Sequence, residues 1–171
     1  GQWFFTNGVA IQKSLRTPGA IPEMIVVGIK NNNPLRRTLF NKERGKFTSF
    51  IKNELIKFID SNFRTTKERV IFGWEAAAYY VSKMVLEEKE LFKGAIITDG
   101  GLAPDKVVAN FSSDEELYLY MTNSRKDIYY IASTDKFNKR LKKHNPKNLR
   151  WKYELFNDEV HETMPHLALY K

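Results

Sequence analysis

Apolar runs of strand length alternate with segments of helical periodicity along the chain, and this alternation constrains the fold more than any other feature. The runs that predict strands are 23–29, 69–74, 94–100, 117–122 and 150–156. The segments that predict helices are 3–16, 46–62, 75–90 and 134–144, with a short helix starting near Pro165. Ile- and Val-rich strands that alternate with helices are typical of a parallel sheet covered by helices on both faces. We therefore predict one doubly wound α/β domain over residues 1–171.

The segments differ in the burial that their patterns predict. Residues 23–29, "EMIVVGI", are continuously apolar and indicate a fully buried strand, whereas 150–156, "RWKYELF", alternates as an edge strand does. Within 46–62 the apolar positions, which include Phe47, Ile51 and Phe58, recur at helical spacing and predict a wide buried stripe.

Composition excludes several classes of site and leaves the compartment open. The chain has no cysteine, so disulfides, thiolate metal sites and cysteine nucleophiles are excluded. We predict no membrane span and no signal peptide at the start of the chain. The formal net charge of +8 admits a nucleic-acid partner. The basic runs 33–46 and 137–152 lack a recognition signature, so we favour a solvated basic face and keep nucleic-acid binding as a third hypothesis.

The junctions after the predicted strands are where a ligand site is expected. In an open parallel sheet, ligands bind outside the carboxyl ends of the strands. The junctions to inspect are Lys30–Asn33, Trp74–Ala76, Thr98–Leu102, Thr122–Asp127 and Asn157–His161.

Those junctions lie in stretches that resemble one enzyme family. "IPEMIVVGI", "FTSFIKNELIKFIDSNFRTTKERVIFGW", "LFKGAIITDGG" and "LRWKYELFNDEVHETMPHLALY" together resemble the esterase D and enterochelin-esterase-like group of α/β-hydrolases. The resemblance implies a serine hydrolase that acts on small esters or thioesters without a metal or cofactor. It also implies that the first strands of the sheet and the end of the last helix lie outside these 171 residues. We therefore expect a further segment or a second copy to cover the sheet edge.

The family's nucleophile elbow, Gly-x-Ser-x-Gly, corresponds here to "GWEAA", residues 73–77. Glu75 stands at the nucleophile position. By the resemblance, Trp74 and Ala76 flank the reacting group, and a second oxyanion donor is expected near Gln2 or Trp3. Glu75 is longer than the aspartate nucleophile of some α/β-hydrolases, and amides at a helix start stabilise its charge. We therefore favour a carboxylate that folds back and blocks the oxyanion hole over one that attacks.

The resemblance implies that His161 is the general base, and the triad acid is less easily assigned. The matching positions Asn123, Ser124 and Arg125 carry no carboxylate, so Asp127, two to three residues farther on, is our candidate. A second acid, Asp99, stands in the turn sequence "TDGG". An ion pair between Glu75 and His161 is a further possibility.

Other motifs carry weaker signals. Arg36 and Arg37 follow the first predicted strand and can bind an anion, although a solvated loop accounts for them equally well. "DEVHE" places three acids around His161, but neighbouring positions on an extended loop rarely converge on one ion, so we predict no metal site. His166 and His144 are expected to have structural roles at helix ends.

Two function classes follow. The first is a degenerate esterase that binds a ligand or acts as a scaffold without hydrolysis. The second is an active hydrolase in which Glu75 serves as nucleophile, or as the base for a water molecule, together with His161.

Overall fold

A four-stranded parallel sheet forms the centre of the molecule. The computed structural model describes residues 2–30 and 33–171. The strands are β1 (Val70–Trp74), β2 (Gly94–Thr98), β3 (Leu117–Ser124) and β4 (Leu149–Phe156), and their spatial order follows their order in the chain. Every neighbouring pair is parallel. The predicted α/β class with a parallel sheet is therefore confirmed.

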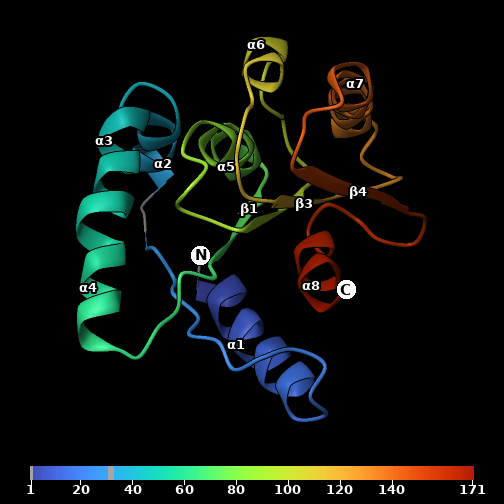
Figure 1. Cartoon of the computed structure of the whole chain (residues 1–171). Coiled ribbons are helices and arrows are strands. Elements are labelled where there is room, and N and C mark those ends of the chain that lie inside the picture. The colour runs from blue at the N-terminus through green and yellow to red at the C-terminus, as the bar shows by residue number, and fades with distance from the viewer. Residues whose placement is uncertain (1, 31–32) are drawn as a thin grey trace.

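Helices cover both faces of the sheet, as Figure 1 shows. Helices α5 (Ala76–Glu87), α6 (Asp105–Ala109) and α7 (Ile128–His144) lie on one side. Helices α1 (Gln2–Arg16) and α8 (Met164–Tyr170) lie on the other side. A long helical arm beside α5 comprises α2 (Asn33–Phe40), α3 (Arg44–Phe50), the π-helical turn η1 (Ile51–Leu55) and α4 (Ile56–Asn62).

The core lies between the sheet and the helices α5 and α7. Ile97 and Met121 point from the sheet, and Met84 and Phe137 from the helices, and all four are almost completely buried. The aromatic cluster Phe40, Phe47 and Tyr80 joins the helical arm to α5. Because β1, β2 and β3 are in parallel register, Trp74, Thr98 and Thr122 stand in one row. The loops that follow these residues therefore meet at one edge of the sheet.

Two predictions of burial are wrong. Residues 23–29 form no strand, and Met24, Ile25, Val27 and Ile29 are each between 39% and 48% exposed. Apolar content alone does not make a strand, which needs a partner for its backbone groups; this segment runs beside α1, where Gly28 lies against the Phe5 ring. Phe58 is 60% exposed, because α4 extends past the body of the domain.

Several helix boundaries also differ from prediction. The stretch 31–46 contains α2, which its clustered asparagines and proline concealed, and α7 begins at Ile128 rather than at residue 134. Among the described residues, no helix combines the length and the apolar character that crossing a membrane requires.

Candidate active site

The turn between β1 and α5 is the one that the family resemblance matches to a nucleophile elbow, and its backbone is strained at Glu75. Glu75 adopts φ 55° and ψ −117°, which is a strained conformation for a residue with a side chain. The Glu75 N–H donates to the Thr98 carbonyl at 3.3 Å, and its own carbonyl accepts from the Ala78 N–H at 3.1 Å. These bonds tie the turn both to the neighbouring strand end and to the first turn of α5.

Two glycines allow the close packing that holds this turn. A Cβ atom on Gly73 would lie 2.9 Å from the Ala77 carbonyl oxygen, and one on Gly100 would lie 2.4 Å from the Glu75 carbonyl oxygen. Both distances are too short for real contacts, so each position needs a residue without a side chain. The elbow is thus fixed by residues on both sides of Glu75.

The Glu75 side chain pairs with an arginine of the helical arm. Its Oε2 lies 3.5 Å from Nη2 of Arg36, and each side chain is one-third exposed. Glu75 accepts no capping hydrogen bond from the first-turn amides of α5. The predicted folding-back of the carboxylate onto those amides is therefore wrong, because Arg36 in α2 draws the carboxylate away from them.

His161 lies between two carboxylates and two aromatic rings. Its Nδ1 is 2.9 Å from Oδ2 of Asp127 and 3.6 Å from Oδ2 of Asp99. Nδ1 of His161 has no hydrogen-bond partner, so both contacts are electrostatic. The imidazole packs against Trp74, with ring centroids 4.8 Å apart, and stacks on Tyr130 at 5.6 Å. The predicted pair between His161 and Glu75 is not formed; the carboxylates beside the ring are those of the two aspartates.

Asp127 reaches His161 through a turn at the end of β3. The Asp127 N–H donates to the Ser124 carbonyl at 3.1 Å, and Asp127 stands at the start of α7. The Lys126 ammonium donates to the Asp158 carbonyl at 3.3 Å, which holds this turn against the loop before His161. A comparison by sequence position does not show this placement, because the turn advances the carboxylate beyond the positions next to the strand.

Asp99, which stands in the turn sequence "TDGG", is almost completely buried. Its side chain has no exposed surface, and φ of 40° places its backbone in the left-handed region. Oδ1 accepts hydrogen bonds from the Asn123 side chain at 3.1 Å and the Ser124 N–H at 2.9 Å, whereas Oδ2 has no hydrogen-bond partner. Burial raises the pKa of Asp99 above that of an ordinary aspartic acid.

Three of these groups have a geometry that can hold a metal ion. One ligand atom each from Asp99, Asp127 and His161 lies within 4.8 Å of the others. The acids come from the ends of β2 and β3, and not from the "DEVHE" stretch that we considered in the sequence. Only the histidine of that stretch takes part.

The remaining candidate residues lie in different settings. The side chains of Gln2 and Trp3 are outside the described residues, so their proposed oxyanion role stays a prediction. His166 Nδ1 accepts a 3.0 Å hydrogen bond from the side-chain amide of Asn7, and its ring stacks on that of Phe4. His144 ends α7 and lies 3.3 Å from Oδ1 of Asp105.

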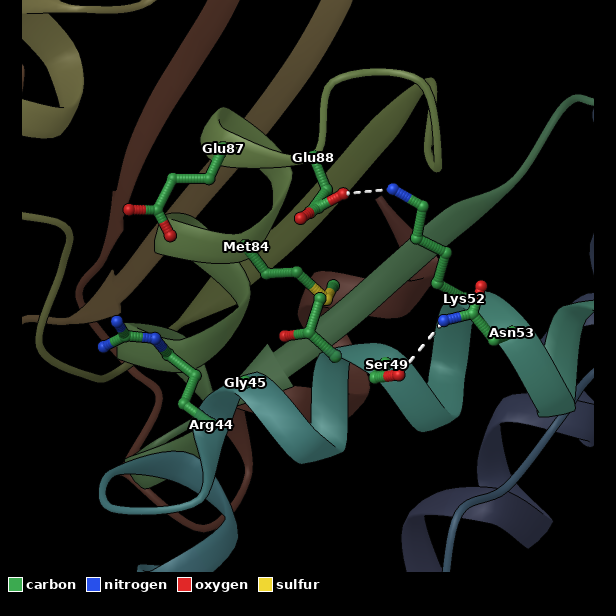
Figure 2. A pocket seen from close by; sticks show the side chains of 9 residues that line it. Arg44, Gly45, Ser49, Lys52, Asn53, Met84, Glu87 and Glu88 are labelled. Atoms are coloured by element: carbon green, nitrogen blue, oxygen red, sulfur yellow. Dashed lines mark hydrogen bonds and ion pairs between the residues drawn. The ribbon is translucent and has the colours of Figure 1, made fainter.

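A cavity of about 350 Å³ opens at the other end of α5, between that helix and the helical arm. Figure 2 shows Met84 and Glu88 on one wall and Arg44 and Lys52 on the other. Lys52 and Glu88 form an ion pair of 2.9 Å across it. This cavity lies away from Glu75, which is at the start of α5, so it is not the candidate active site.

Comparisons with solved structures identify the fold. The chain superposes on an IroE-like serine hydrolase from Shewanella oneidensis with a TM-score of 0.82 at 22% identity, covering 97% of this chain and 64% of that one. The fold is that of the esterase-like α/β-hydrolases. A siderophore hydrolase, EstA, from Aspergillus nidulans gives a TM-score of 0.71 at 12% identity, covering 99% of this chain and 77% of that one. The BES protein from Bacillus cereus gives a TM-score of 0.75 at 16% identity, and the match covers 98% of this chain and 78% of that one.

The chain therefore spans about two-thirds of the length of the Shewanella hydrolase. No protein-family model matches the chain, and no curated protein sequence matches it.

Proposed function

We propose that this chain is a degenerate esterase, which keeps the esterase fold and a ligand-binding edge but does not transfer acyl groups. The observation that carries this proposal is Glu75, which occupies the strained elbow position and is ion-paired with Arg36. The ligand class that we infer from the fold and its neighbours is a small ester or thioester, bound at the strand ends beside His161.

The chemistry of the pair argues against attack by Glu75. A carboxylate whose negative charge is stabilised by a guanidinium is a weaker nucleophile than a free one. His161 cannot activate Glu75 as it would activate a serine, because a carboxylate that is already ionised has no proton to give up. In this proposal, the elbow and His161 are the two parts of an acyl-transfer site that lacks the hydroxyl between them.

A second function rests on the strain at Glu75. Residues with strained backbones are common at active sites, where the direction of a side chain matters. Each such residue lowers the stability of the fold by roughly 1–3 kcal/mol. Glu75 holds this strained conformation at the start of α5. The strain supports a hydrolase in which the Glu75 carboxylate attacks the substrate or activates a water molecule. In that case release of the carboxylate from Arg36 would precede the reaction.

Hydrolysis of p-nitrophenyl acetate and butyrate separates the two functions. We expect wild-type protein to release no nitrophenol above the rate in buffer, and Glu75→Gln to behave identically. Turnover by the wild type that Glu75→Gln abolishes would establish the second function and contradict the first. Arg37→Gln is the matched control, because Arg37 is the exposed neighbour of Arg36 on the same helix. This substitution should leave any measured rate unchanged.

A further inference from the structure

We propose that Asp99, Asp127 and His161 form a binding site for one divalent first-row transition-metal ion. The site lies at the carboxyl ends of β2 and β3 and in the loop after β4. The inference does not depend on ester hydrolysis, because metal binding is measured without any ester.

Two unsatisfied buried atoms point to this ligand. Asp99 Oδ2 and His161 Nδ1 are both buried and have no hydrogen-bond partner. They lie 3.6 Å apart and face each other, and Asp127 Oδ2 lies 2.9 Å from the same nitrogen. Buried polar atoms are seldom left without a partner in native proteins. A single ion among these three atoms would satisfy all of them at once.

The separations fit metal coordination. Zinc lies about 2.0–2.2 Å from imidazole nitrogen and carboxylate oxygen, so two ligands in a tetrahedral arrangement are about 3.4 Å apart. The two measured separations, 2.9 and 3.6 Å, lie on either side of that value. One nitrogen and two carboxylate oxygens form a donor set suited to zinc, manganese or ferrous iron, with further positions left for water.

The surroundings orient the ligands as in a metal centre. The Asn123 side chain and the Ser124 N–H hold the other oxygen of Asp99, and such outer contacts fix the direction of a ligating carboxylate. Trp74 and Tyr130 pack on the His161 ring and fix its plane. The ligand atoms are therefore held in place before an ion arrives.

The charge balance also favours a dication. The site brings two carboxylates to one imidazole, and one of the carboxylates is fully buried. Among the described residues, neither aspartate forms an ion pair with a lysine or an arginine. A buried carboxylate without a full counter-charge is costly, and a divalent ion offsets that cost.

Titration calorimetry with zinc chloride on chelator-treated protein at pH 7 tests the site. We expect one ion per chain with a dissociation constant tighter than about 10 μM, a threshold that corresponds to roughly 7 kcal/mol of binding free energy. Asp99→Asn and Asp127→Asn should each weaken binding by at least about tenfold, since each removes a charged ligand. If Asp99→Asn fails to fold by circular dichroism, Asp127→Asn carries the test, because Asp127 lies near the surface.

Asp105→Asn is the matched control, because Asp105 is also paired with a histidine, His144, but at an exposed site where, among the described residues, Asp105 is the one carboxylate paired with that ring. This variant should bind zinc as the wild type does. The proposal is overturned if the wild type shows no saturable binding, or if the affinity survives in Asp127→Asn. It is also overturned if Asp105→Asn removes the binding.

Discussion

The turn at Glu75 and the aspartate–histidine cluster lie at the same edge of the sheet, yet they differ in how their carboxylates are paired. At the elbow the backbone of Glu75 has a positive φ, and its carboxylate is paired with Arg36 on the helical arm. In the cluster, two carboxylates, those of Asp127 and the buried Asp99, lie beside the ring of His161.

The backbone geometry of the turn and the side-chain geometry of the cluster therefore depend on different contacts. The elbow is held by packing around Gly73 and Gly100, which does not depend on the residue-75 side chain. The cluster is held by hydrogen bonds to side chains and by ring contacts, which do depend on residue identity. The predictions below separate these two kinds of constraint.

Gly100→Ala should have the largest effect on stability. The new methyl group would lie 2.3 Å from the Ala78 Cβ and 2.4 Å from the Glu75 carbonyl oxygen, and neither atom can swing aside. We expect a loss of about 3 kcal/mol in the free energy of unfolding, measured by urea denaturation. Gly45→Ala is the control, because Gly45 lies in a helix with open space around it, and there alanine should stabilise the protein by about 1 kcal/mol.

Glu75→Gly should stabilise the protein by about 1 kcal/mol, because glycine adopts the positive φ of residue 75 without strain. Glu75→Ala separates the strain from the ion pair, since it removes the pair with Arg36 and keeps a side chain in the strained turn. We expect Glu75→Ala to change stability by less than about 1 kcal/mol, as for other partly exposed pairs. Equal stability of the glycine and alanine variants would refute the account of strain.

Asp99→Asn should change how stability depends on pH. Burial raises the pKa of Asp99 in the folded protein above its value of 3.8 in the unfolded chain. The stability gained from this shift is therefore fully present below the unfolded value and is lost as pH rises through the folded pKa. Urea unfolding with a chelator present, from pH 4 to pH 7, should show a fall that is smaller in the asparagine variant. Parallel curves for the two proteins would contradict this account.

The spacing of apolar residues predicted the fold well, because it reflects which residues are buried. All four strands and the helices α1, α5 and α8 lie within a few residues of their predicted positions. The strand predicted for residues 23–29 is wrong for a physical reason. An apolar run indicates that a segment can be buried, but only a neighbouring strand makes it part of a sheet. Whether a further segment or a second copy covers the sheet edge stays a prediction.

The candidate site was only partly predictable. The family resemblance pointed to His161 and Glu75, because each stands at the position of a family motif. Asp99 could not be preferred over the other candidate acids, because a turn sequence such as "TDGG" does not reveal that the aspartate is buried. The contact of Asp127 with His161 depends on how the turn after Ser124 folds, and that geometry is not encoded in spacing alone. Arg36 was considered as a binder of an anion, but its ion pair with Glu75 was not predicted.

The most direct test of the central claim is covalent labelling with a fluorophosphonate, read by intact-protein mass in the presence of a chelator. The oxygen of an activated serine attacks the phosphorus of this reagent and displaces fluoride, while the hydroxyl proton passes to the general base. If the site lacks only its nucleophile, Glu75→Ser should gain one label per chain, the wild type should gain none, and adding His161→Ala to Glu75→Ser should slow labelling by at least about 100-fold. A folded Glu75→Ser variant that stays unlabelled, or a wild type that is labelled, would contradict the account.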